Sequence, residues 1–75
     1  MNQKQAFYQS HLWHANENHK RMAEMQRKAG NERLAVASER TALARRIAAR
    51  NFEGFRGDLK AAVDYGEFAV NTNLC

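Results

Sequence analysis

The chain has 75 residues, a formal net charge of +4 and no proline. This length allows one domain, and no apolar run approaches the 20 or so residues of a membrane-spanning helix. No apolar segment of the signal-peptide type follows the polar N-terminal residues, so we expect a soluble, cytoplasmic protein. A single cysteine, Cys75, excludes a disulfide framework within the chain.

Large core-forming residues are scarce in this sequence. Leu, Ile, Val and Phe together make up 13 of the 75 residues, and Ala supplies another 13. Ala is the best helix former but fills a core poorly. We therefore expect helices with a thin core, and a homodimer that supplies the missing burial.

The first predicted helix covers residues 4–29. A spacing of alternately four and three residues predicts a heptad-type stripe along one of its faces. The stripe consists of Tyr8, Leu12, Ala15, His19, Met22, Gln26 and Ala29. Phe7, Trp13 and Met25 lie beside or off this stripe, so one helical hairpin cannot bury all of them.

Gly30 and Asn31 predict a tight turn, because Gly favours the left-handed conformation that ends a helix and Asn is a good N-cap. The second predicted helix then covers residues 32–51, antiparallel to the first. Its predicted apolar face contains Val36, Ala37, Leu43, Ala44, Ile47 and Ala48. Arg40 falls near the middle of this face, where it must extend to solvent or meet a carboxylate, either Glu24 or a group on a second chain.

Gly54 and Gly57 predict the end of the second helix, and Asp58 is the expected cap of a third. The third helix is predicted over residues 58–71, followed by a polar tail at residues 72–75. Gly66 within it indicates either a close contact between helices or a bend. We expect Phe52, Phe55, Tyr65 and Phe68 to form the main core cluster. The predicted fold class is all-α, an antiparallel helical hairpin plus a shorter third helix, within a single domain spanning residues 1–75.

The sequence contains no catalytic motif. No nucleophile and base share a pattern, and no glycine-rich phosphate-binding loop is present. His11, His14 and His19 lack the third or fourth ligand that zinc requires on a shared face. We therefore predict no enzymatic activity, no cofactor and no metal site.

The candidate partner-binding residues are arginines of the second helix and two aromatic residues of the first. They are Arg33, Arg40, Arg45, Arg46 and Arg50 with Tyr8 and Trp13. Trp, Tyr and Arg are the residue types enriched in binding hot spots, and a basic chain favours acidic partners.

These features favour a small protein-interaction module that docks on a larger protein with an acidic surface. Its size and lack of motifs suggest an inhibitor, encoded by a phage or mobile element, that disables a host protein. One alternative is a nucleic-acid-binding protein that uses the arginine-rich second helix. Another is an oligomer that clamps a small phosphate-bearing ligand with Tyr8 and interfacial arginines.

Overall fold

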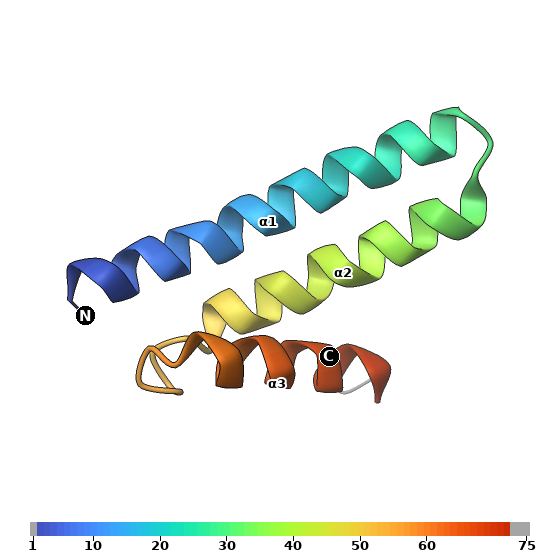
Figure 1. Cartoon of the computed structure of the whole chain (residues 1–75). Coiled ribbons are helices and arrows are strands. Elements are labelled where there is room, and N and C mark those ends of the chain that lie inside the picture. The colour runs from blue at the N-terminus through green and yellow to red at the C-terminus, as the bar shows by residue number, and fades with distance from the viewer. Residues whose placement is uncertain (1, 73–75) are drawn as a thin grey trace.

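The computed structural model describes residues 2–72, and its regular elements are three α-helices (Figure 1). They are α1 (Gln3–Lys28), α2 (Glu32–Arg50) and α3 (Leu59–Asn71). α1 and α2 form an antiparallel hairpin, and the shorter α3 lies along the C-terminal part of α2. This confirms the predicted all-α class, and each helix ends within one residue of its predicted bounds. Residues 73–75 of the predicted tail, including Cys75, lie outside the described residues.

Local hydrogen bonds explain where α1 and α3 begin. The side chain of Asn2 accepts a bond from the Gln5 amide at 2.8 Å, and the Gln5 side chain accepts one from the Asn2 amide at 3.1 Å. This reciprocal capping box satisfies backbone donors that a helix start otherwise leaves free, and the sequence analysis did not identify it. The predicted cap of α3 is confirmed, because Asp58 accepts a bond from the amide of Ala61 at 3.1 Å.

The turn between α1 and α2 lies where the sequence predicts it. Gly30 has a φ of +82°, in the region that Gly adopts readily. Asn31 occupies the N-cap position, but its side chain makes no capping bond to α2. Its side-chain nitrogen Nδ2 instead donates to Oε1 of Gln26 at 3.0 Å, so Asn31 links the turn back to α1.

Small and polar residues form the contact between α1 and α2. Ala35, Ala42 and Ala49 recur every seven residues on α2, and none is more than 3% exposed. On α1, Asn16 donates to the carbonyl of Ala42 at 2.6 Å, and Gln9 donates to that of Ala49 at 3.2 Å. Because both pairs share one antiparallel register, successive heptad positions of the two helices face each other.

The predicted stripe on α1 is confirmed in part, but the buried face is rotated from its centre. Leu12 of the stripe is buried, and Tyr8, Ala15, His19 and Gln26 are half-buried. Met22 is 45% exposed, whereas Asn16 and Ala23, which lie outside the stripe, are buried. The alanines of α2 explain this shift, since their short side chains let α1 approach closely enough for Asn16 and Gln9 to reach backbone carbonyls.

The predicted apolar face of α2 is also wrong in part. Ala44 and Ala48 are buried as expected, but Val36 is 43% exposed and Ala37 is exposed. Arg40 is exposed as well, so it does not lie within a buried apolar face. α2 uses two alanine-lined sides, one toward α1 and one toward α3, in place of the single face predicted.

α3 packs against α2 at Gly66. A Cβ at this position would collide with the carbonyl oxygen of Ala44 and would lie 3.3 Å from the amide nitrogen of Ala48. Of the two explanations offered for Gly66, close contact between helices is therefore the correct one. Ala62 and Ala69 flank it and are buried.

The core lies at the end of the molecule where all three helices meet. Its buried members are Leu12, Ala48, Ala49, Phe52 and Ala62, and the partly buried Tyr8, Phe55, Leu59 and Val63 pack against them. The predicted aromatic cluster is only partly confirmed, because Tyr65 is 38% and Phe68 55% exposed. Phe68 lies two residues after Gly66, so it projects from the opposite side of α3.

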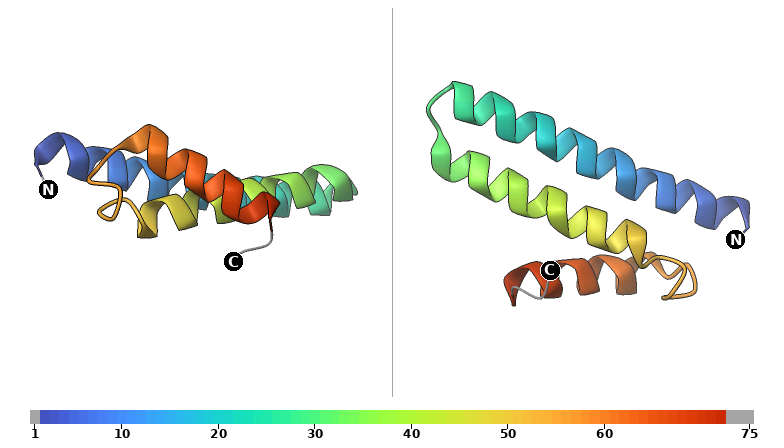
Figure 2. Two further views of the ribbon diagram at one scale, coloured as in Figure 1. Left: turned by 90° about the horizontal axis from the view of Figure 1, so that it is seen from below. Right: turned by 180° about the vertical axis from the view of Figure 1, so that it is seen from behind.

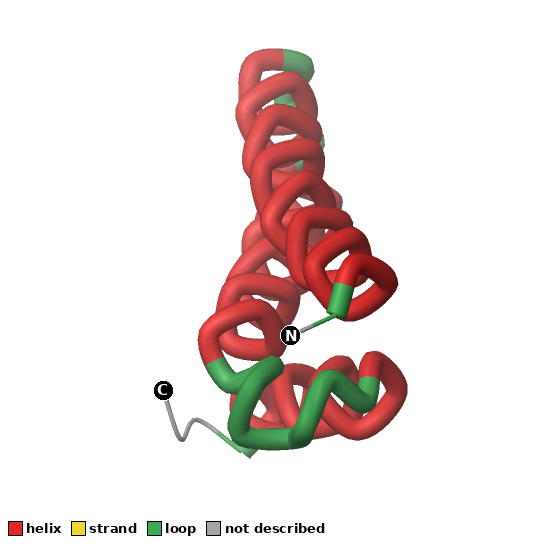
Figure 3. The backbone as a smooth tube through the Cα atoms, turned by 90° about the vertical axis from the view of Figure 1, so that its left-hand side faces the viewer, coloured by secondary structure: helices red, strands yellow, loops and turns green. Residues whose placement is uncertain are grey.

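The three helices form a flattened body of 42 × 26 × 14 Å with α2 in the middle. Seen face-on, α2 lies between α1 and α3 (Figures 1 and 2), and seen end-on the three helices draw together near the N-terminus of α1 (Figure 3). The turns of residues 51–57 close the end opposite Gly30 (Figure 3). There Gln5 donates to the carbonyl of Arg56 at 3.1 Å, which links α1 to the connection before α3. None of the described helices is long and apolar enough to cross a membrane.

Candidate functional site

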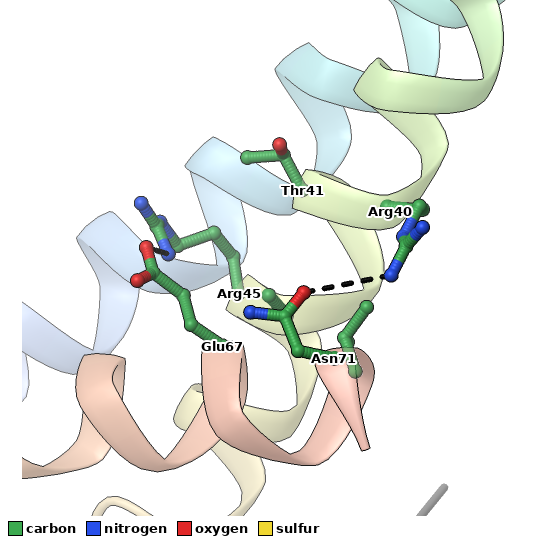
Figure 4. Close-up of a pocket in the computed structure, with 7 residues that line it drawn as sticks. Arg40, Thr41, Arg45, Glu67 and Asn71 are labelled. Atoms are coloured by element: carbon green, nitrogen blue, oxygen red, sulfur yellow. Dashed lines mark hydrogen bonds and ion pairs between the residues drawn. The ribbon is translucent and has the colours of Figure 1, made fainter. Parts of the chain in front are cut away.

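The arginines of α2 do not form one basic surface, because two of them are engaged by α3. Arg45, whose side chain is 23% exposed, pairs with Glu67 at 3.3 Å. Arg40 donates to Oδ1 of Asn71 at 3.5 Å. Figure 4 shows both arginines extending from α2 toward α3, around a cavity of about 200 Å³.

These contacts give Arg40 and Arg45 a structural explanation. Arg40 lies near the C-terminus of α3, whose last turn contains no basic residue of its own. A cation from α2 complements the partial negative charge at that helix end. The predicted contact of Arg40 with Glu24 is not formed, because its partner is Asn71.

The side of the hairpin away from α3 has a different character. A shallow groove of about 170 Å³ runs between α1 and α2 there. It is lined by Asn16, Lys20, Glu39, Ala42, Leu43 and Arg46. Leu43 and Arg46 are half-buried, and Asn16 is buried at the bottom of the groove.

Trp13 lies on the same side of α1 as this groove, but it is not one of the lining residues. It precedes Lys20 by seven residues, two helical turns, so both side chains project from the same side of α1. The register that places Asn16 opposite Ala42 places Trp13 opposite Arg45, within one residue of the level of Arg46. Trp13 is 38% exposed, and Arg50, one turn after Arg46, is exposed as well. We call Trp13, Lys20, Leu43, Arg46 and Arg50 the Trp13 face.

Of the three cations of the Trp13 face, Lys20 pairs with Glu17 at 3.6 Å, whereas the two arginines have no carboxylate partner among residues 2–72. Glu39 lines the same groove, but it pairs with Arg27 across the hairpin. The hydrogen bond from Arg27 lowers the pKa of the Glu39 carboxyl, which keeps that carboxylate engaged.

Two predicted binding residues lie elsewhere. Tyr8 packs against the core on the α3 side, with its ring 6.0 Å from that of Phe7. Arg33 is exposed and precedes Glu39, the first groove residue of α2, by six residues. Of the predicted binding residues, Arg46 lines the groove, and Trp13 and Arg50 are exposed on the same side of the hairpin. Tyr8, Arg33, Arg40 and Arg45 are not part of this side.

Lys20 and Leu43 line the groove but are not among the binding residues predicted from the sequence. The available signal was the seven-residue spacing of Trp13 and Lys20, together with the same spacing of Ala35, Ala42 and Ala49. The alanine repeat identifies the side of α2 that contacts α1, and Arg46 and Leu43 follow from it as neighbours in the groove.

Two further observations bear on function. Among residues 2–72, no three His, Cys, Asp or Glu side chains come close enough to hold one metal ion. Comparison of the chain with protein-family models, with curated proteins and with solved structures found no match. Function is therefore inferred from the surface of the molecule itself.

Proposed function

We propose that this protein is a non-enzymatic protein-interaction module that binds an acidic surface of a larger protein through its Trp13 face. The observation that supports this most directly is the position of Arg46. Arg46 is half-buried, lines the groove and has no carboxylate partner among the described residues. A partly desolvated cation gains most from a partner that supplies negative charge.

The distribution of apolar side chains supports a binding role. Phe52 and Leu12 are the largest apolar side chains that are fully buried, whereas eight large apolar side chains are exposed. Single exposed apolar residues are ordinary, but here they outnumber the large residues of the core. Covering part of this surface with a partner would add burial that the chain cannot provide alone.

Binding in this way would block whatever the target's acidic surface normally contacts. The proposal therefore includes inhibition, in which a phage- or mobile-element-encoded chain disables a host protein by occupying one of its surfaces. A compact basic and aromatic face suits this task, since Trp and Arg contribute disproportionately to interface energy.

The alternative of nucleic-acid binding gains less support from the geometry. Of the five arginines of α2, Arg40 and Arg45 are engaged by α3, and Arg33 projects away from the groove. A phosphate backbone is best met by a continuous line of cations. The alternative of an oligomer that clamps a small phosphate-bearing ligand would have to bring Tyr8 of one copy to arginines of another, because Tyr8 packs against the core and Arg46 lines the groove.

The proposed function is tested by affinity capture from lysate of the source cells, with and without nuclease. We expect one stoichiometric protein that survives nuclease and is lost with Trp13→Ala. Phe7→Ala is the matched control, because Phe7 is a 67% exposed aromatic residue of α1 outside the Trp13 face. Capture that disappears with nuclease, or that Phe7→Ala reduces as much as Trp13→Ala, would contradict the proposal.

A further inference from the structure

We infer that the partner presents an amphipathic α-helix that lies in the groove of the Trp13 face and places a carboxylate against Arg46. This inference rests on the proposed function and specifies the structure and chemistry of the target. Three observations support it: the contact that Arg45 makes within the chain, the unpaired charge of Arg46, and the shape of the groove.

The chain itself shows how an arginine of this part of α2 is satisfied. Arg45 and Arg46 are consecutive residues, and they project to the two sides of the α1–α2 contact. On one side, Arg45 meets Glu67 of α3 at 3.3 Å. α3 is a helix of 13 residues that packs on α2 through Gly66 and supplies this carboxylate.

On the other side, Arg46 has the corresponding position but no helix to meet it. Glu39, the carboxylate that lines the same groove, is already engaged because it pairs with Arg27, and Glu17 of α1 lies 3.6 Å from Lys20. Among the described residues, no carboxylate meets Arg46 as Glu67 meets Arg45. A carboxylate from outside the chain would complete it in the same way.

The groove runs along the hairpin, in the direction that a third helix would take. It lies between two antiparallel helices, and along α2 its lining extends seven residues from Glu39 to Arg46, about 10 Å. Two to three turns of a partner helix match this length. Its apolar residues, one turn apart, would contact Trp13 and Leu43, and an acidic residue would lie between Lys20 and Arg46.

The experiment is a selection of 18-residue peptides from a display library designed to form amphipathic helices with randomised surface positions. The target is the full chain, and binding of the selected peptides is measured by fluorescence of Trp13, the only Trp in the chain. We expect peptides with Asp or Glu at one fixed position, a shift in Trp13 emission on binding, and at least tenfold weaker binding to Arg46→Glu.

Two further variants separate charge recognition from damage to the fold. Arg46→Gln removes the charge without reversing it and should weaken binding by an intermediate factor. Arg33→Glu makes the same charge change at an exposed site of α2 outside the groove, and should leave affinity within about twofold, the difference expected of a screened distant charge. Changing the acidic residue of the peptide to Lys should restore binding to Arg46→Glu.

Several outcomes would overturn the inference. These are a failure to select helices, selected helices without a fixed acidic position, and peptides that bind wild type and Arg46→Glu equally. Tighter binding of a 20-base-pair DNA duplex than of any peptide, sensitive to Arg46→Glu, would assign the groove to nucleic acid. Trp13-dependent capture of a protein from lysate together with a failed selection would leave the proposed function in place and reject only the helical partner.

Discussion

At the scale of single residues, Asn16 sets how the two long helices meet. It is 1% exposed, and its side chain donates to the carbonyl of Ala42 at 2.6 Å. A buried amide that reaches a backbone carbonyl of the neighbouring helix is satisfied in only one register, as a buried Asn is in a coiled coil. Asn16 therefore selects the register that places Trp13 within one residue of the level of Arg46.

Replacing Asn16 should destabilise the hairpin. Asn16→Ala removes the hydrogen bond and leaves space at a buried position, so the free energy of unfolding should fall by about 1–3 kcal/mol. Urea denaturation followed by circular dichroism measures this. Asn18→Ala is the control, because Asn18 is exposed on the same helix and should change the value by less than about 0.5 kcal/mol. Equal effects of the two changes would show that the buried bond contributes nothing.

Gly66 has a similar importance for α3. Gly66→Ala would add about 1 kcal/mol of helix propensity, but its Cβ would collide with the carbonyl oxygen of Ala44. The Cβ is fixed to the backbone of α3 and the oxygen belongs to the backbone of α2, so neither can move without its helix. The steric cost should therefore exceed the gain and lower the free energy of unfolding by about 1–3 kcal/mol. The same urea experiment tests this, and a variant more stable than wild type would contradict the packing of α3 on α2.

At the scale of elements, a charge network closes the turn end of the hairpin. Arg27 of α1 bonds Glu39 and lies 3.1 Å from Glu32, both on α2. The hydrogen bond from Arg27 lowers the pKa of Glu39 below its ordinary value of 4.5. A carboxyl with a lowered folded-state pKa contributes stability above its unfolded pKa and loses it as the pH falls through the folded value.

Removal of the Arg27 side chain should therefore raise the pKa of Glu39. In an NMR titration of the side-chain carboxyl, the midpoint for Glu39 should be higher in Arg27→Gln than in wild type. It should also rise toward the ordinary value in 1 M salt, because the pair is exposed and screening weakens it. Arg21→Gln removes a nearby exposed cation of α1 and should leave the Glu39 midpoint unchanged. An unchanged midpoint in Arg27→Gln would exclude the pair in solution.

At the scale of the whole molecule, three helices with a small common core leave eight large apolar side chains of residues 2–72 exposed. The turn end of the hairpin extends past α3 (Figure 1), and four of the eight exposed large apolar residues lie near it. These residues, the apolar tip, are Met22, Met25, Leu34 and Val36, with exposures of 45%, 68%, 53% and 43%. The apolar tip is separate from the Trp13 face, so self-association and partner binding need not compete.

We expect the chain to self-associate through the apolar tip. Sedimentation velocity should show an average mass that rises with concentration. The double change Met25→Gln and Leu34→Gln should weaken association at least about tenfold, since burying each such side chain contributes about 1.5–3 kcal/mol. Phe7→Gln is the control, because it removes an equally exposed apolar residue at the other end of α1. A wild-type chain that stays monomeric at all concentrations would contradict the expectation.

The sequence alone determined the fold class, the three helices and the positions of their ends. These features depend on local chemistry: Gly30 ends α1, Asp58 caps α3, and a chain rich in Ala without Pro forms helices over the segments between. The division of the chain into a hairpin and a shorter helix followed from the same signals.

Only the tertiary structure decided which side of each helix is buried and which arginines remain available. The hydrophobic pattern predicted that Val36 and Met22 are buried, yet both are exposed. Ala35, Ala42 and Asn16 form the contact between α1 and α2. Short side chains let two helix backbones approach closely, which improves packing. This gain depends on both helices, so the residue pattern of one helix does not predict it. For the same reason Arg45 and Arg46, neighbours in sequence, have different environments: α3 covers one with Glu67 and leaves the other facing the groove.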